Sequence, residues 1–208
     1  PALTEVKLSD LLAVRWYPIE NYFGILPLIT GSLVITIGAM LIAFPFGIAT
    51  AVFISEIAPR WVREILKPLV ELLAGLPSVV LGFLGILVLS PNLRVLLDLP
   101  TGLTALTGSI LLGGIAVPTI VSIAEDALDS VPRSYREGAW ALGATRWQTI
   151  WRVTLPAARS GVLTAVMLGI GRAIGETMTV MMVTGNAPVL AIKLSSIVSP
   201  VRTMTATI

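Results

Sequence analysis

The sequence predicts an all-α protein built as a bundle of membrane-spanning helices. Only 12% of the 208 residues are charged, about half the usual share, so there is too little polar surface to solvate a globule. The mean hydropathy is +0.92. The apolar residues also fall in four long blocks, and a helix needs about 20 apolar residues to cross a bilayer.

The spans follow one another along what we expect to be a single transmembrane domain over residues 1–208. The segment before the first span carries Trp and Tyr residues, which favour the membrane interface. Turn-forming or charged segments separate the apolar blocks. We expect spans at about 28–54, 65–89, 103–124 and 161–184.

Basic residues predict the orientation of these spans. The aqueous segments 55–67 and 125–160 hold 8 of the 14 Lys and Arg residues, whereas the other aqueous segments hold 5. Because cytoplasmic loops are enriched in Lys and Arg, the polar block 125–160 is expected in the cytoplasm. The remaining basic residue, Arg172, falls inside the fourth span.

The composition argues against most enzyme chemistry. The chain has no His and no Cys, which removes the commonest acid–base group and the thiolate nucleophile. No HExxH, GxSxG or GxxxxGK[ST] motif occurs. We therefore expect no catalytic residue, no metal site, no cofactor and no nucleic-acid partner. We expect membrane lipid to surround the chain.

Two short helices are expected inside the polar block, which we place at 125–156. Sequences typical of capping boxes begin at Ser134 and Thr145. Gly143 lies between them, where a helix end favours a left-handed residue. The pattern predicts helices at about 135–142 and 146–154.

The second of these helices carries an apolar stripe with two alternative roles. Trp147, Ile150, Trp151 and Thr154 recur at i, i+3, i+4 and i+7. The stripe either lies against lipid headgroups or docks into a groove on a soluble partner.

Three acidic residues, Glu125, Asp126 and Asp129, begin the polar block. We expect them to end a helix and to pair with Arg133 or Arg136. The alternative is a gating role at the cytoplasmic exit.

Arg172 is the least expected residue of the fourth span. It lies 11 residues beyond Gly161, roughly 16 Å into a core about 30 Å thick. A charge there costs about 2.5–3.5 kcal/mol, and Glu176 at i+4 is within pairing reach. The pair either fixes helix packing or lines a passage for an anion, with the hydroxyls of Thr177 and Thr179 nearby.

Two further features accompany this arginine. Ala165 and Gly169 share its helical face, and small residues permit close helix approach. In the second span, Pro77 and Ser78 either form a simple kink or break the helix and expose amides that bind anions.

The polar block also carries a motif. Glu137-Gly138-Ala139, then Gly143, then Val153-x-Leu155-Pro156 resemble the "EAA" loop of ABC importer permeases, with Gly for the first Ala and Val for Ile. The resemblance implies that this loop docks an ATP-binding subunit. The residues implied in ATPase coupling are Glu137, Gly138, Ala139, Gly143, Ala144, Leu155 and Pro156.

Four stretches narrow the resemblance to phosphate ABC importer permeases of the PstC type. They are FGILPLITGS (23–32), GLPSVVLGFLG (75–85), EDALDSVPRSYREGA (125–139) and GRAIGETMTVMMVTGNAP (171–188). The resemblance implies a type I, MetI-like helical bundle with six spans, so the first and last family helices are expected to be missing here.

The implied function is that of a non-enzymatic permease subunit of an ATP-driven importer of inorganic phosphate; molybdate or sulfate is the alternative cargo. The implied partners are a PstA-type permease, two ATP-binding subunits that hold ATP and Mg²⁺, and an extracytoplasmic phosphate-binding protein. The implied location is the inner membrane of a bacterial or archaeal cell, as a multi-pass protein. The implied translocation path comprises Arg172, Glu176, Thr177, Thr179 and Ser78.

Overall fold

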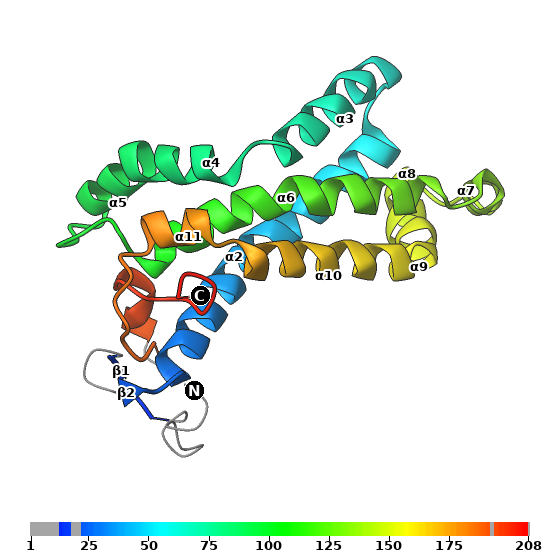
Figure 1. The fold of residues 1–208 in the computed structure, drawn as a ribbon. Coiled ribbons are helices and arrows are strands. Elements are labelled where there is room, and N and C mark those ends of the chain that lie inside the picture. The colour runs from blue at the N-terminus through cyan, green and yellow to red at the C-terminus, as the bar shows by residue number, and fades with distance from the viewer. Residues whose placement is uncertain (1–12, 18–21, 192–193, 208) are drawn as a thin grey trace. The chain divides into compact units, whose positions relative to one another are not determined.

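The computed structural model describes residues 13–17, 22–191 and 194–207. Two short strands, β1 (Trp16–Tyr17) and β2 (Tyr22–Phe23), pair antiparallel. Helices account for most of the described residues, which confirms the all-α class (Figure 1). In chain order the described helices are α2 (Leu26–Val52), η3 (Phe53–Ile57), α3 (Arg60–Ala74), α4 (Ser78–Leu84), η4 (Gly85–Leu89), α5 (Ser90–Leu96), α6 (Ala105–Asp129), α7 (Arg133–Ala141), α8 (Arg146–Thr149), η5 (Ile150–Thr154), α9 (Leu155–Ala157), α10 (Arg159–Gly175), α11 (Met178–Val183) and η6 (Leu194–Val198).

Within the described residues, three helices are long and apolar enough to cross a membrane. They are Leu26–Ile57, Ser78–Leu96 and Ala105–Asp129. A fourth span results if Arg146–Ala157 and Arg159–Gly175, bent by 74°, count as one. The sequence therefore located the apolar blocks, but two of its expected helices are interrupted.

The first interruption lies in the expected span 65–89. Helix α3 ends at Ala74 and α4 begins at Ser78, with Pro77 in an extended conformation between them. Of the two alternatives for Pro77 and Ser78, a kink or a break, the structure shows the break, so the expected span 65–89 is not one helix. Helix α3 has no buried residue, and the apolar helix that is long enough to span begins only at Ser78.

The second interruption lies in the expected span 161–184. Helix α10 ends at Gly175 and α11 begins at Met178, so Glu176 and Thr177 lie outside both helices. The expected span is therefore not one helix, and the face that carries Ala165, Gly169 and Arg172 ends with α10 at Gly175.

Three π-helical turns, η3, η4 and η5, are each followed by a proline in the sequence. In η3, η4 and η5 the closing amide belongs to Ala58, Ser90 and Leu155, and each of these residues directly precedes a proline. Proline has no amide hydrogen and crowds the carbonyl four residues back. An i→i+5 turn just before it is one way in which a helix accommodates that loss.

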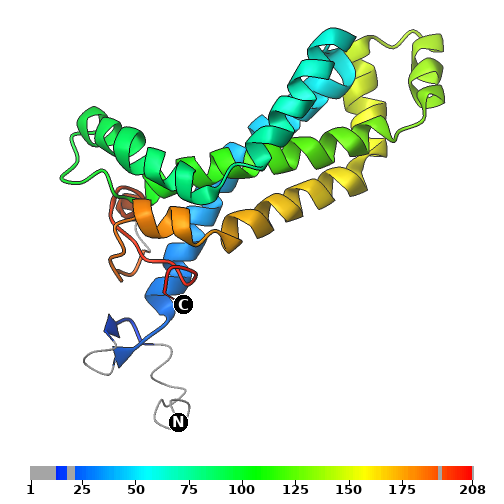
Figure 2. The same ribbon diagram turned by 45° about the horizontal axis from the view of Figure 1, so that its top comes forward.

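The described chain divides into two compact units. The first comprises 1–39, 77–113 and 173–208, and the second comprises 40–76 and 114–172. In the first unit, α4 and α11 lie side by side in both ribbon views (Figures 1 and 2). Their approach is close at Gly82, where an added Cβ would lie 3.2 Å from the Thr179 Cα.

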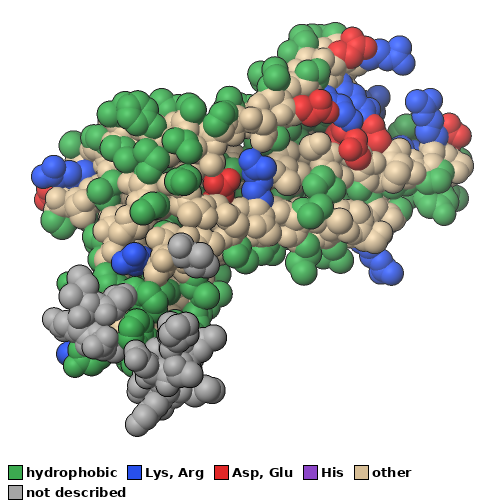
Figure 3. Space-filling model, viewed as in Figure 1, with side chains coloured by type: hydrophobic (Ala, Val, Ile, Leu, Met, Phe, Trp, Pro, Cys, Tyr) green, Lys and Arg blue, Asp and Glu red, His purple; other side chains and the backbone are tan. Residues whose placement is uncertain are grey.

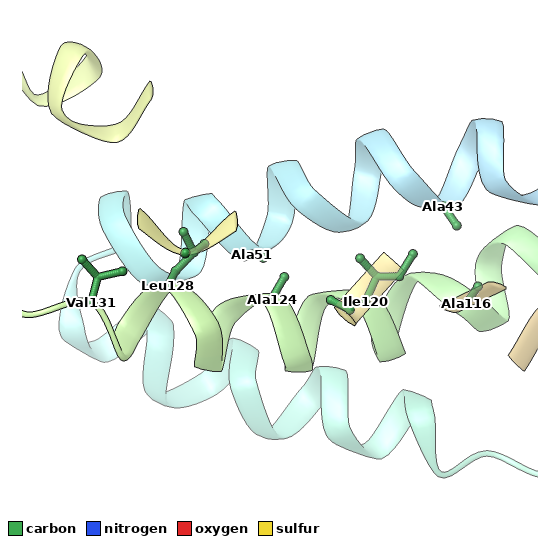
Figure 4. Close-up of a cluster of buried hydrophobic side chains, with 9 residues drawn as sticks. Ala43, Ala51, Ala116, Ile120, Ala124, Leu128 and Val131 are labelled. Atoms are coloured by element: carbon green, nitrogen blue, oxygen red, sulfur yellow. The ribbon is translucent and has the colours of Figure 1, made fainter. Parts of the chain in front are cut away.

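The second unit is held together around α6. A cluster of small and branched apolar side chains joins the second half of α2 to α6 and α10 (Figure 4). Ile120 is fully buried at its centre. An added Cβ would lie 2.7 Å from Ile120 at Gly47 of α2 and 2.5 Å from it at Gly169 of α10. The two glycines thus let both helices approach α6 around one side chain.

Candidate functional site

The loop that resembles the EAA motif folds as two short helical segments in the second unit. Thr145 accepts a hydrogen bond from the Gln148 amide while the Gln148 side chain accepts one from Thr145 N, which confirms this capping box. Gly143 has φ 79°, the left-handed conformation expected between the helices. The box expected at Ser134 is wrong, because α7 begins at Arg133 after Pro132 and has no side-chain cap.

The residues assigned to ATPase coupling lie along this loop. Glu137 and Gly138 are exposed on α7, and Gly143 is exposed in the turn. Leu155 is half-buried and packs against the apolar cluster around α6. The remaining members of this set are Ala139 and Ala144, which are half-buried, and Pro156, which is exposed.

The aromatic stripe of the second short helix does not form one face. Ile150 and Thr154 are buried, whereas Trp147 and Trp151 are exposed, with their rings edge to face at 5.8 Å. The reason is the wide turn η5, which changes the helical repeat at Ile150. The exposed tryptophan pair alone is available for a headgroup or a partner protein.

Arg136 holds α7 against the rest of the second unit, through Glu56 of η3 and two backbone carbonyls. Its Nη2 lies 2.5 Å from Glu56 Oε1 of η3, and its Nε donates to both oxygens of the same carboxylate. The guanidinium also donates to the carbonyls of Val131 (2.7 Å) and Leu128 (2.9 Å). Both side chains are largely buried, with 14% and 9% of their surface exposed. A partly buried bidentate pair of this kind fixes orientation as well as distance.

A second charged cluster joins α3 to the C-terminal end of α6. Glu125 is only 1% exposed; it accepts hydrogen bonds from Arg63 Nη2 at 2.6 Å and from Lys67 Nζ at 2.7 Å. Lys67 also reaches Asp126 at 2.8 Å, and Arg63 pairs with Asp129. These charges gather over α3 and the end of α6 in the space-filling view (Figure 3).

These pairs correct an expectation from the sequence. The acidic residues Glu125, Asp126 and Asp129 do not pair with Arg133 or Arg136 among the described residues. They do end a helix, as expected, because α6 continues to Asp129. Their partners come from α3, because its basic residues at i and i+4 face α6.

Two neighbouring carboxylates favour the charged form of Lys67. Hydrogen bonds to Asp126 and Glu125 raise its pKa above the ordinary value of lysine, although partial burial opposes the shift. Helix α3 lies outside the three candidate spans. The ammonium therefore stays protonated near neutral pH, and the cluster keeps its two cations.

A polar cleft of about 430 Å³ opens between these two clusters. Glu56, Arg63 and Asp129 line one part of it, and Arg136, Glu137 and Trp140 line the part formed by α7. Among the described residues, no group of Asp, Glu, His or Cys is placed to hold a metal ion. The cleft thus presents a mixed-charge surface beside the EAA-like loop.

Close packing of α10 on α6 sets the position of Arg172. An added Cβ on Gly161 would lie 2.4 Å from Ala127, Ala165 is fully buried, and Gly169 meets Ile120. This confirms the predicted face of small residues. The arginine follows one turn later, in the last turn of α10.

The guanidinium of Arg172 is incompletely partnered. Its Nη2 donates to the carbonyl of Ala74, in the last turn of α3, at 3.2 Å. Its Nε is buried and has no hydrogen-bond partner. In the described part of the chain the ion pairs do not include Arg172. Two helix C-termini, those of α3 and α10, offset its charge only in part.

The other residues assigned to the path belong to the first unit. Thr179 is buried, and its hydroxyl donates to the carbonyl of Ser78 at 2.9 Å. This bond ties the start of α11 to the start of α4. The carbonyl of Glu176 accepts a hydrogen bond from Thr205 at 3.2 Å. Thr177 is the residue before α11 and makes no side-chain cap.

Sequence reasoning missed four residues of this arrangement: Glu56, Arg63, Lys67 and Ala74. One signal was available. Arg63 and Lys67 stand four residues apart on a helix whose other side is apolar, as do Glu125 and Asp129 on α6. Such spacings place like charges on one face of a helix. These charges require a face of opposite charge on another helix.

Comparison with known proteins agrees with this helical fold. Residues 43–205 match the family model described as "Binding-protein-dependent transport system inner membrane component". The probable ABC transporter permease protein YqgH of Bacillus subtilis is 50% identical over 88% of this chain and 60% of its own length. The phosphate transport system permease protein PstC of Xylella fastidiosa is 37% identical over 100% of this chain and 69% of its own length.

A third relative is the phosphate transport system permease protein PstC 1 of Mycobacterium tuberculosis, 37% identical over 98% of this chain and 64% of its own length. The chain thus spans between 60% and 69% of the length of these three relatives. With its apolar helices, it is a multi-pass membrane protein. The chain belongs to the family of binding-protein-dependent transport system inner membrane components, and within that family it is similar to permeases of the PstC type.

Proposed function

We propose that the chain is the permease subunit of an ATP-driven importer, that it provides the passage for inorganic phosphate, and that it docks an ATP-binding subunit through the EAA-like loop. Hydrolysis then takes place on the partner, with ATP and Mg²⁺ bound there and no cofactor on this chain. The other proposed partners are a PstA-type permease, a second ATP-binding subunit and an extracytoplasmic phosphate-binding protein. The proposed location is the inner membrane of a bacterial or archaeal cell.

One observation carries the choice of an anion: among the described residues, the guanidinium of Arg172 has no carboxylate partner. Within the part of the chain that the structure describes, its Nε is buried without a hydrogen-bond partner, and its Nη2 donates to a carbonyl. A cation in an apolar segment is costly unless something negative compensates it. A guanidinium presents a planar fork of donors that suits a phosphate oxyanion. The relatives named for phosphate transport support the same cargo.

The remaining path residues stay predictions. The hydroxyl of Thr179 and the carbonyl of Ser78 form a hydrogen bond beside two helix starts. Glu176 and Thr177 lie at the break that follows α10. We propose that these residues line the same passage as Arg172.

The test replaces Arg172 with Gln in the full-length chain, assembled with its partners, and measures uptake of labelled phosphate. We expect uptake to fall about tenfold or more, because a hydrogen bond to a charged group contributes about 1.5–3 kcal/mol. Arg159→Gln is the matched control, since it removes the same charge from the exposed first residue of the same helix. Equal uptake by the two variants, with normal assembly, would remove Arg172 from the passage.

A competition assay separates the cargoes. Excess unlabelled molybdate or sulfate should leave uptake of labelled phosphate unchanged. Strong inhibition by one of them would instead assign the passage to that oxyanion.

A further inference from the structure

Within the second unit, a continuous series of polar contacts runs from the EAA-like loop to Arg172. It begins on α7, where Arg136 pairs with Glu56 of η3 at 2.5 Å. On the neighbouring residue of η3, Ser55 donates to Asp129 of α6 at 2.7 Å. The same aspartate pairs with Arg63 of α3.

The series continues through α3. Arg63 and Lys67 hold α3 against the buried carboxylate of Glu125. Two turns further along this helix, the carbonyl of Ala74 accepts the hydrogen bond from Arg172. Helix α3 thus contacts the charged end of α6 through Arg63 and Lys67, and it contacts Arg172 through its own last residue, Ala74.

Two features make the position of α3 sensitive to its polar contacts. It has no fully buried side chain, and none of its residues belongs to the apolar cluster around α6. It is also bounded by an extended residue on each side, Pro59 before it and Pro77 after the turn at Gly75. The helix has 15 residues, with Pro68 among them, and at roughly 22 Å it is long enough to reach from the charged end of α6 to Arg172. Its position therefore depends on its polar contacts, of which those to Glu125 are the most buried.

We propose that α3 carries the position of α7 to Arg172, and that Glu125 is the positioning residue that makes this possible. This inference rests on the proposed function, because it needs an ATP-binding partner on α7. When that partner moves α7, the pair between Arg136 and Glu56 moves η3. Through Ser55 and Asp129, η3 then moves the charged cluster at the end of α6. Helix α3 follows because Glu125 holds it, and the carbonyl of Ala74 shifts relative to Arg172. The hydrogen bond that partly satisfies the guanidinium is then made or broken.

The first measurement does not involve phosphate. The chain has no Cys, so spin labels can be placed at Leu72→Cys on α3 and Met167→Cys on α10, both exposed sites of the second unit. In the assembled full-length transporter, we expect the distance between the labels to change when ATP binds. Glu125→Gln should abolish that change, and Glu64→Gln, at an exposed residue of α3, should leave it intact. An unchanged distance in the wild type, or the same change in Glu125→Gln, would overturn the proposal.

The second measurement tests whether Glu125 acts through Arg172. Phosphate-stimulated ATP hydrolysis is compared for Glu125→Gln, Arg172→Lys and the double variant, after the ATP-binding subunit is shown to co-purify at the wild-type ratio. We expect each single change to reduce stimulation at least fivefold and the double change to reduce it no further. A purely structural role predicts that the two losses multiply, and that outcome contradicts the inference.

The uptake assay and the label distance together separate this inference from the proposed function. If Arg172→Gln leaves uptake intact while the label distance still responds to ATP through Glu125, the choice of anion path fails and the role of α3 stands. If uptake is lost in Arg172→Gln while the label distance is insensitive to Glu125→Gln, the path stands and the role of α3 fails.

Discussion

The contact between α10 and α6 at Gly169 allows a quantitative prediction. An alanine Cβ at this position would lie 2.5 Å from Cγ1 and 2.7 Å from Cδ1 of Ile120, whereas ordinary contacts begin at 3.4 Å. Ile120 cannot move away, because Gly47 of α2 meets its Cγ2 on another side. Overpacking of this kind costs about 1–3 kcal/mol.

A matched control isolates the clash from helix propensity. Gly171 lies two residues further along α10, and an added Cβ there would meet nothing within 4 Å. Both changes to Ala gain up to about 1 kcal/mol of helix propensity. We therefore expect Gly169→Ala to be less stable than Gly171→Ala by about 1–3 kcal/mol.

Thermal unfolding of the full-length chain in detergent, followed by tryptophan fluorescence, measures this difference. At about 2–4 °C per kcal/mol for a chain of this size, it amounts to several degrees in Tm. In an Ile120→Ala background, which removes both clashing atoms, the cost of Gly169→Ala should fall by about 1 kcal/mol or more. Equal Tm values for Gly169→Ala and Gly171→Ala would refute the close approach of the two helices.

Two further predictions concern the EAA-like loop. Gly143→Val forces a branched residue into φ 79°, a strain of about 1–3 kcal/mol, so less ATP-binding subunit should co-purify. Gly143→Asn, which tolerates the left-handed conformation, is its control, and a wild-type ratio for Gly143→Val would contradict the prediction. Thr145→Ala removes the oxygen that caps α8 at a cost of about 0.5–2 kcal/mol. Amide hydrogen exchange at Gln148 should then speed up roughly twofold to thirtyfold; an unchanged rate, or the same acceleration in Thr145→Ser, would count against the cap.

Features that depend on neighbouring residues could be predicted from the sequence. The apolar blocks, the left-handed turn at Gly143 and the cap at Thr145 each arise within a few residues of the chain. The small-residue face of α10 was predicted for the same reason, since helical periodicity places Ala165 and Gly169 together. Local rules failed at Ser134, where the proline before the helix displaced the expected cap.

Only the tertiary structure decided which charges meet. Local reasoning paired Glu125 with Arg133 or Arg136, but its partners are Arg63 and Lys67, 62 and 58 residues away in the chain. It also left open whether the chain breaks at Pro77, and it did not anticipate the break after Gly175. A charge pairs with the opposite charge that the fold brings near it. The sequence by itself thus determined the membrane helices and the loop chemistry, whereas packing between distant segments decided the partners of Glu125, Glu56 and Arg172.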